Sequence, residues 1–301
     1  MAKIVVVQGP TAVGKSAVAI EIARHYNCKI LSADSRQFYK EMAIGTAVPS
    51  SEELAAAHHY FIQDRSVIEP LSAGGYEVEA SSLIAELSEG LASDDIAAVV
   101  VGGSGLYVDA LIWGLDPLPG DELIRSELTN TYNAEGLKPL LDELERLDPT
   151  TYAEIERSNP QRVIRALEVC RVSGKAYSSL KSNSKTSKFD FIKIIVDLPR
   201  EELYRRIDGR VDIMMSEGLE AEARSVYKYR DYNALRTVGY SEMFDYFDGA
   251  ITLERAVELI KQHSRNYAKR QITWLRREEQ HPRFSPFEPG KIFAHIDRHT
   301  I

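Results

Sequence analysis

The stretch from Gly9 to Ser16 constrains the fold of this chain more than any other part of its sequence. It reads Gly-Pro-Thr-Ala-Val-Gly-Lys-Ser and matches the phosphate-binding pattern G-x-x-x-x-G-K-[ST]. A continuous apolar run at residues 3–8 precedes it, as in a strand buried on both faces, and a helical pattern at 17–24 follows it. This is the context that a phosphate-binding P-loop requires. The sequence therefore predicts a P-loop in an α/β domain, without specifying which phosphate compound binds.

The residue types in this loop explain how it would hold a diphosphate group. The glycines allow a tight turn that points backbone N–H groups inward, and the following helix N-terminus favours anions. Lys15 supplies a compact positive charge, and the Ser16 hydroxyl can ligate a magnesium ion. The predicted diphosphate-binding residues are Gly9, Pro10, Thr11, Ala12, Val13, Gly14, Lys15 and Ser16.

A carboxylate that many P-loop enzymes possess is missing from its usual place. P-loop ATPases and kinases often hold magnesium with a carboxylate that closes a later hydrophobic strand. The best such strand, at residues 97–101, is followed by Gly102, Gly103 and Ser104. The carboxylate at a strand end is instead Asp34, which could also act as a turn or cap residue. Because ligands bind at the carboxyl ends of parallel strands, we expect Asp34, Ser104 and the P-loop to line one crevice.

Strand and helix patterns alternate along the first part of the chain. Strand patterns occur at 3–8, 29–33, 96–101 and 189–198, with helical patterns at 17–24 and 76–91 between them. This alternation predicts a parallel sheet covered by helices. The expected fold is α/β, with a P-loop NTPase-like parallel sheet and an inserted, mainly helical domain.

The insertion is predicted from a change of pattern at about residue 115. Between 115 and 188 the sequence has proline punctuation and amphipathic helical patterns but no strand pattern. One helix is expected at 136–147 and another from Asn159, before a polar linker at 181–188. We therefore predict a catalytic core of residues 1–114 and 189–301 and an insertion domain of residues 115–188.

Charge is distributed unevenly along the chain. The formal net charge is −8, made up of −13 over residues 1–150 and +5 over residues 151–301. A basic second half can attract phosphates despite the negative total, although chance asymmetry is the alternative. Two distant cysteines, Cys28 and Cys170, suggest a reducing compartment. With no targeting pattern and no membrane-length apolar run, we expect a cytoplasmic protein without membrane association, and a monomer.

Further motifs carry a resemblance to a known family. They are Ser32-Ala33-Asp34-Ser35-Arg36-Gln37-Phe38-Tyr39, Ile44-Gly45-Thr46-Ala47, His58-His59, Gly102-Gly103-Ser104-Gly105-Leu106-Tyr107, the Asn159–Glu168 segment, Val238-Gly239-Tyr240 and Lys269-Arg270-Gln271-Ile272-Thr273-Trp274-Leu275-Arg276. With the P-loop, and in this order, they resemble the tRNA dimethylallyltransferases, also called tRNA isopentenyltransferases, in their short bacterial form. The matches span about residues 9–276. The chain departs from the family pattern at Ala43 and Val48, where many members have Asp and Lys.

The resemblance implies a reaction and its partners. The family transfers a dimethylallyl group from dimethylallyl diphosphate to N6 of the adenosine at position 37 of tRNA, in the anticodon loop. It depends on magnesium (Mg2+), and its inserted helical domain helps to hold the anticodon stem-loop. Its P-loop binds the diphosphate of the prenyl donor instead of hydrolysing ATP, which agrees with the missing strand-end carboxylate.

The resemblance also assigns catalytic roles. An exocyclic adenine amine is a poor nucleophile, because its lone pair is delocalised into the ring, so a positioned base is needed. Asp34 matches the base of the family, Ser104 supplies a hydroxyl, and Arg224 matches an arginine at the diphosphate. Without the resemblance, Arg224 would be interpreted as a solvated helix residue.

The target base must leave the stack of the anticodon loop to reach this crevice, as is usual for enzymes that modify bases. A basic stripe of Lys261, Arg265, Lys269 and Arg276 on the last long helix could contact phosphates or could simply be solvated. The predicted tRNA contacts are Asp34, Ser35, Arg36, Gln37, Ser104, Arg125, Gln161, Arg162, Arg165, Arg236, Gly239, Tyr240, Lys269, Arg270 and Arg276.

Three other functions use the same features differently. A small-molecule or nucleotide kinase would bind ATP at the P-loop and transfer its phosphate. An adenylate prenyltransferase would modify the free nucleotide, but the inserted helical region and the basic stripe favour a polynucleotide. An inert RNA-binding module would leave the intact P-loop and Asp34 without a purpose.

Overall fold

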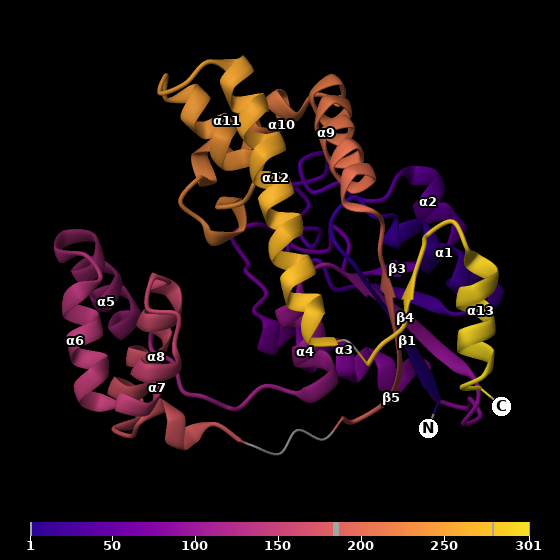
Figure 1. Ribbon diagram of the computed structural model, residues 1–301, viewed down its shortest axis with the longest axis horizontal. Coiled ribbons are helices and arrows are strands. Elements are labelled where there is room, and N and C mark those ends of the chain that lie inside the picture. Colours follow the sequence, from indigo (N-terminus) through magenta and orange to yellow (C-terminus); the bar gives the residue numbers. More distant parts are fainter. Residues whose placement is uncertain (1, 183–186, 279, 301) are drawn as a thin grey trace. The chain divides into compact units, whose positions relative to one another are not determined.

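The computed structural model describes residues 2–182, 187–278 and 280–300. In these residues, six strands form one parallel sheet in the order β3-β2-β4-β1-β5-β6 (Figure 1). The strands are β1 (Lys3–Gln8), β2 (Lys29–Ser32), β3 (His59–Tyr60), β4 (Ile96–Gly102), β5 (Asp190–Val196) and β6 (Arg283–Phe284). The predicted parallel sheet is therefore confirmed. The sequence patterns did not reveal β3 and β6, because a two-residue strand has no periodicity.

The helices outside residues 115–186 cover both faces of the sheet. They are α1 (Lys15–His25), α2 (Ser51–Ala56), α3 (Ala73–Leu87), α4 (Gly105–Trp113), α9 (Arg200–Glu217), α10 (Leu219–Val226), α11 (Tyr240–Phe247), α12 (Leu253–Leu275) and α13 (Pro289–Asp297). Short 3-10 turns span Tyr227–Tyr229, Asn233–Leu235 and Arg276–Glu278. No described helix is both long and apolar enough to cross a membrane.

The central strand β1 separates two hydrophobic cores. Its side chains alternate, so Ile4 and Val6 pack with α3, α4 and α12, whereas Val5 and Val7 pack with α1, α9 and α13. All four side chains are fully buried. This two-sided burial explains why the strand reads as a continuous apolar run, and it fixes the position of the P-loop at the carboxyl end of β1.

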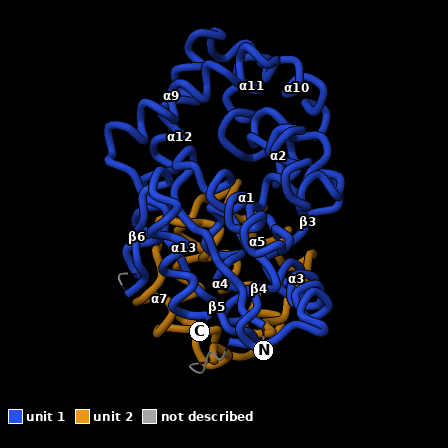
Figure 2. Tube along the Cα trace, turned by 90° about the vertical axis from the view of Figure 1, so that its right-hand side faces the viewer, with its two compact units in different colours: residues 1–114, 187–301 blue, residues 115–186 orange. Residues whose placement is uncertain are grey.

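The chain divides into two compact units, coloured separately in Figure 2. Unit 1 contains Met1–Gly114 and Ser187–Ile301, and unit 2 is Leu115–Thr186. Unit 2 consists of α5 (Glu122–Glu135), α6 (Lys138–Leu147), α7 (Pro149–Glu154), α8 (Pro160–Ser173) and a 3-10 turn at Tyr177–Leu180, with no strand in its described residues. Of the predicted linker at 181–188, residues 183–186 lie outside the described residues.

Helix α8 begins where the sequence predicted a start. The Asn159 side chain accepts a hydrogen bond from the Arg162 N–H, and Pro160 occupies the first turn. Val163 and Leu167, on the buried side of α8, pack against Leu128 and Leu144 in the core of unit 2. The cap and the apolar face together determine which side chains α8 exposes.

Candidate active site

The P-loop, Gly9 to Ser16, joins the end of β1 to the start of α1. A side chain at Gly9 would collide with the Val196 carbonyl oxygen of β5, which lies 2.5 Å from the place that its Cβ would take, so only glycine fits. Gly14, just before α1, has φ +105°, a conformation that favours glycine. Ala12 also has a positive φ, of 62°. The loop therefore turns tightly between β1 and α1 and leads directly into the helix N-terminus.

Lys15 lies inside the loop. Its Nζ donates a hydrogen bond to the Pro10 carbonyl oxygen at 2.8 Å. Burial lowers the pKa of the Lys15 ammonium to about 8; the Asp34 carboxylate opposes this shift and Arg210 reinforces it. Lys15, Asp34 and Arg210 therefore act on one another electrostatically at the carboxyl edge of the sheet.

Two arginines of α9, Arg206 and Arg210, form a positive region with Lys15, and no sequence motif marks them. Arg206 and Arg210 line a cavity of about 630 Å³ together with Lys15 and Ser16. Burial lowers the pKa of the Arg210 guanidinium below its usual range, although Asp34 and Glu53 oppose the shift. No ion pair joins Arg210 to any residue that the structure describes. The guanidinium is thus available to an anionic ligand in this cavity, which we call the P-loop cavity.

Arg224 does not occupy the place expected from the resemblance. Its side chain is 59% exposed on α10, pairs with Glu220 at 3.5 Å and stacks on the Phe247 ring at 3.9 Å. It lines neither cavity described here. The inward-facing charge of α10 is Glu222 instead, so the prediction that places Arg224 at the diphosphate is wrong. The buried arginine that lines the P-loop cavity is Arg210.

Asp34 and Ser104 come together as predicted from the parallel sheet. The Asp34 Oδ1 accepts a hydrogen bond from the Arg36 N–H at 3.1 Å. The Ser104 Oγ accepts the Ser35 N–H at 3.1 Å and its hydroxyl lies 3.2 Å from the Ser35 Oγ. These bonds join the end of β2 to the end of β4 and fix the Asp34 carboxylate at the crevice.

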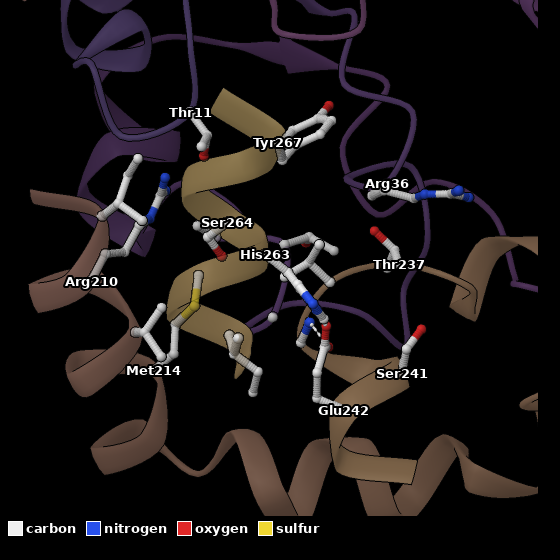
Figure 3. A pocket seen from close by; sticks show the side chains of 18 of the residues that line it. Thr11, Arg36, Arg210, Met214, Thr237, Ser241, Glu242, His263, Ser264 and Tyr267 are labelled. Carbon is white, nitrogen blue, oxygen red and sulfur yellow. Dashed lines mark hydrogen bonds and ion pairs between the residues drawn. The ribbon is translucent and has the colours of Figure 1, made fainter. Parts of the chain in front are cut away.

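A second cavity, of about 640 Å³, has Asp34 in its wall, and we call it the Asp34 cavity. Figure 3 shows that α12 crosses it, with Arg210 and Met214 of α9 on one side and Arg36 and Thr237 on the other. The Asp34 cavity and the P-loop cavity share four lining residues, which are Ala12, Ala47, Arg210 and Met214. The two cavities therefore adjoin, with Lys15 in the wall of the P-loop cavity and Asp34 in the wall of the other.

Tyr267 of α12 places a phenol beside Asp34. Burial, together with the Asp34 charge, raises the pKa of the Tyr267 hydroxyl to about 12, while a hydrogen bond with Ser104 opposes that shift. Tyr267 is consequently protonated at neutral pH and can donate a hydrogen bond to a ligand.

The loop before α2 is held by one carboxylate. Glu222 accepts hydrogen bonds from the N–H groups of Ala43, Ile44 and Gly45 at 2.8–2.9 Å. The Tyr240 hydroxyl donates to the same carboxylate at 2.6 Å. Tyr240 is fully buried, so the prediction that it contacts tRNA is wrong; its ring packs against Gly45, where no side chain would fit.

Gln37 also works within the protein. Its amide donates to the carbonyl oxygens of Thr46 and Ala47 at 3.2 and 2.9 Å. Gly239, with φ +99°, and the exposed Arg236 do line the Asp34 cavity, as do Ser35 and Arg36. Of the predicted tRNA contacts, Ser35, Arg36, Arg236 and Gly239 therefore line the Asp34 cavity. Gln37 does not line it and is hydrogen-bonded within the protein.

Gln271 is a connection that the sequence did not predict. Its Oε1 accepts the Thr11 N–H of the P-loop at 2.8 Å, and its Nε2 donates to the Gly103 carbonyl oxygen at 2.9 Å. The side chain is buried, with 6% exposed. One amide of α12 thus fixes the P-loop to the end of β4.

The basic stripe of α12 is divided between two uses. Arg265 pairs with Asp208 and Lys261 pairs with Asp212 at 2.5 Å, both on the neighbouring helix α9. Lys269 and Arg276 of the stripe are exposed, as is Arg270 beside them, and none of the three forms an ion pair with a described residue. The packing of α9 against α12 explains the first pair of contacts, and only the C-terminal part of the stripe is open to a ligand.

The predicted contacts in unit 2 surround one buried carboxylate. Glu168, 1% exposed, accepts hydrogen bonds from Arg125 and Arg165 at 2.9 Å and from the Asp121 N–H at 3.0 Å. Arg162 pairs with Glu156 on the surface, and Gln161 is exposed. Arg125 and Arg165 therefore have a structural partner, whereas Gln161 is open to solvent.

Replacing Glu168 with glutamine is expected to lower the free energy of unfolding of the full chain by about 2 kcal/mol, because charge-assisted hydrogen bonds are lost. Burial by itself would raise the pKa of the Glu168 carboxyl, but bonds from Arg165, Arg125 and Asp121 lower it overall. Its stabilisation should therefore be complete above the unfolded value of 4.5 and disappear as the pH falls through the lower folded value. Denaturant titrations test this, with the exposed Glu156→Gln expected to change stability by less than about 0.5 kcal/mol. Equal stability of the two variants at neutral pH would contradict the expectation.

Comparison with known proteins supplies a family. Residues 37–278 match the family model described as IPP transferase. A tRNA dimethylallyltransferase of Flavobacterium johnsoniae is 47% identical over 93% of this chain and 92% of its own length. The tRNA dimethylallyltransferase 2 of Parabacteroides distasonis is 43% identical, and the match covers 100% of both chains.

Solved structures show the same relationship. A full-length tRNA isopentenylpyrophosphate transferase of Bacillus halodurans has 35% identity and a TM-score of 0.71, covering 100% of this chain and 98% of that chain. A eukaryotic dimethylallyltransferase described as acting on tRNA has 25% identity and a TM-score of 0.75, covering 91% of this chain and 70% of that chain. On the strength of these matches, the chain belongs to the IPP transferase family, alongside the tRNA dimethylallyltransferases.

Proposed function

We propose that this chain transfers a dimethylallyl group from dimethylallyl diphosphate to N6 of adenosine 37 in the anticodon loop of tRNA, releasing diphosphate. The observation that carries the proposal is the pair of adjoining cavities, one lined by Lys15 and the other by Asp34. The family membership favours prenyl transfer to tRNA over phosphoryl transfer. We also propose that this chain acts as a monomer.

The P-loop cavity is suited to the diphosphate of the donor. As the C1–O bond of the donor breaks, negative charge grows on the leaving diphosphate. Lys15, Arg206 and Arg210 would stabilise that charge, together with the N–H groups at the start of α1. These groups are in place before the reaction, so little reorganisation is required.

The residues around the P-loop also fit a magnesium ion. Ser16 presents a hydroxyl to the P-loop cavity, but the described residues include no cluster of three His, Cys, Asp or Glu side chains that could hold a metal. Magnesium commonly takes most of its ligands from substrate phosphates and water. Ser16 would therefore hold the ion, which would neutralise part of the diphosphate charge when bound.

The Asp34 cavity would receive the extruded adenine. The N6 lone pair attacks C1 of the donor, a C–N bond forms, and the C1–O electron pair leaves with the diphosphate. The N6 proton passes to the Asp34 carboxylate, which the Arg36 N–H holds in position. The Tyr267 and Ser104 hydroxyls lie beside Asp34 and can orient the base through hydrogen bonds.

The dimethylallyl group would lie where the two cavities adjoin. Ala12, Ala47 and Met214 provide an apolar wall there, and among the described residues Met214 is the only long apolar side chain that lines both cavities. A five-carbon group requires such a wall, because leaving its methyl groups in water forfeits roughly 0.8 kcal/mol for each carbon.

Met214→Ala should therefore enlarge the space for the prenyl chain. We expect the kcat/KM for geranyl diphosphate, relative to dimethylallyl diphosphate, to rise by about tenfold, which corresponds to roughly 1.4 kcal/mol. Competition between the two donors at saturating tRNA measures this ratio directly. Met215→Ala is the matched control, since Met215 packs against the core without lining either cavity. An unchanged ratio in the Met214 variant would remove Met214 from donor selection.

The proposed acceptor is tested with labelled dimethylallyl diphosphate, supplied with unmodified tRNA and, in parallel, with free AMP. We expect label in tRNA alone, because the exposed Lys269, Arg270 and Arg276 suit a polyanion. That result would support the proposal. Label only in AMP would identify an adenylate prenyltransferase. Consumption of ATP with a small acceptor, and no prenyl transfer, would identify a kinase.

A further inference from the structure

The last described segment of the chain, residues 280–300, has no part in the reaction described above. Its strand β6 pairs with β5, and the chain then turns at residues 285–288 into α13, which packs beside α1 (Figure 1). The Ser285 Oγ accepts the Phe287 N–H at 3.3 Å, and the Ser285 carbonyl oxygen accepts the Glu288 N–H at 3.2 Å. These bonds fix the shape of residues 285–288, which we call the Phe287 turn.

The Phe287 turn reaches the P-loop. A Cβ built on Gly14 would lie 3.2 Å from the Cβ of Pro286 and 3.6 Å from an Nη of Arg206. Gly14 and Arg206 both line the P-loop cavity. The Phe287 turn and an arginine of α9 therefore meet at the last glycine of the P-loop.

The Arg206 guanidinium lies over the ring of Phe287. Its Cζ is 5.7 Å from the ring centroid, which is within the range of a cation–π contact. Among the described residues, no carboxylate forms an ion pair with Arg206. Phe287 is 65% exposed and belongs to neither of the two cores beside the sheet, so its ring contributes little to the packing of the protein. The contact with Arg206 gives this exposed ring a role.

The charges around the P-loop cavity explain why an aromatic ring suits this place. Lys15, Arg206 and Arg210 line one cavity, so their charges repel one another when no anion is bound. Burial is the main reason that the pKa of Arg210 is lowered, and the Arg206 charge adds to that shift. A carboxylate would hold Arg206 against this repulsion, but it would then compete with an anionic ligand. The face of an aromatic ring attracts a guanidinium without neutralising its charge.

We propose that Phe287 is a positioning residue, which holds Arg206 at the P-loop cavity ready to bind the diphosphate of the donor. The inference rests on the proposed function, because it takes the P-loop cavity as the place of that diphosphate. The ring acts on binding alone, through Arg206, and it forms or breaks no covalent bond. The group that it serves is a diphosphate, whether free or attached to a prenyl chain.

Equilibrium titrations of the full chain with dimethylallyl diphosphate and with inorganic diphosphate test the inference. Phe287→Leu keeps an apolar side chain but removes the aromatic face, and we expect the dissociation constants of both ligands to rise by about threefold. Phe287→Tyr keeps the face and should bind both ligands as the wild type does. Tyr232→Leu is the control, since Tyr232 is another exposed aromatic residue, 43% exposed, and lines neither cavity. It should leave both dissociation constants unchanged.

A double substitution separates positioning from a structural role. In an Arg206→Ala background, Phe287→Leu should cause no further loss of affinity, because the ring acts through the arginine. A loss that adds in full to that of Arg206→Ala would show that Phe287 affects the cavity in another way, and it would overturn the inference.

Fluorinated phenylalanine at position 287 keeps the inference testable if Phe287→Leu does not fold. Fluorine atoms withdraw electrons from the face of the ring with little change of volume, so the dissociation constant of inorganic diphosphate should rise stepwise from phenylalanine to its 4-fluoro and 3,4,5-trifluoro forms. Equal affinity across this series, in an enzyme that binds diphosphate, overturns the inference. Wild-type enzyme that binds neither ligand would instead refute the proposed function, so the two failures are distinguishable.

Discussion

Replacing Asp34 with asparagine is expected to lower turnover by roughly 10²–10⁴-fold, the usual contribution of a positioned general base. Asparagine retains the oxygen that accepts the Arg36 N–H, so the turn after β2 should be preserved. The amide cannot take a proton from N6 as the C–N bond forms. Single-turnover rates with saturating donor and tRNA measure the chemical step, and the affinity for tRNA should change by less than about threefold.

The control for Asp34 is a carboxylate of similar local geometry at the opposite edge of the sheet. Asp95 precedes β4 and accepts the Ala92 N–H at 2.8 Å, so Asp95→Asn changes the same charge away from both cavities. We expect it to leave turnover unaltered. Should Asp34→Asn turn over as fast as the wild type, Asp34 has no role as the base; a loss confined to tRNA affinity would make it a binding residue.

The second large effect concerns the donor. Lys15→Met should raise the dissociation constant of dimethylallyl diphosphate by roughly 10–100-fold, because a charge-assisted contact is worth about 1.5–3 kcal/mol. Equilibrium binding of the donor measures this without chemistry. The exposed Lys29, at the start of β2, provides the control, since Lys29→Met changes the same charge at the other end of the strands. Unchanged donor affinity in Lys15→Met would contradict the assignment of the P-loop to the diphosphate.

The pKa of Lys15 gives this contact a pH dependence. Burial lowers it to about 8, and only the protonated ammonium attracts the donor. Affinity should therefore be constant below about pH 8 and fall as the pH rises through that value. Lys15→Met should show a weak but flat profile over the same range. A wild-type profile that stays flat well above this pKa would exclude Lys15 as the group that binds the diphosphate.

The core of this fold was predictable because its signals are local. The Val-rich runs of β1 and β4 have no polar face, which identifies strands buried on both sides. From parallel strands alone it followed that Asp34 and Ser104 meet the P-loop at one edge, as they do. Two-residue edge strands such as β6 carry no comparable pattern.

The side chains that complete the site were harder to predict, because they depend on how distant helices pack. Arg210 and Arg224 are both helix arginines, and nothing local distinguishes them; only the position of α9 beside the P-loop selects Arg210. Spacing offered one usable signal, since Arg206, Arg210 and Met214 recur every four residues and so share one helix face. Tyr240 was predicted to contact tRNA because it follows the motif residue Gly239. Its side chain is instead fully buried and donates a hydrogen bond to Glu222, so RNA cannot reach it.

The alternating side chains of β1 also determine how much change this strand can tolerate. Ile4 and Val5 point into different cores, so inserting or deleting one residue would exchange the two sets of side chains. The P-loop follows without a spacer, and the close contact of Gly9 with Val196 would be lost in the same slip. Length variation in this strand is therefore excluded as a source of diversity, and divergence there is restricted to substitutions of similar volume.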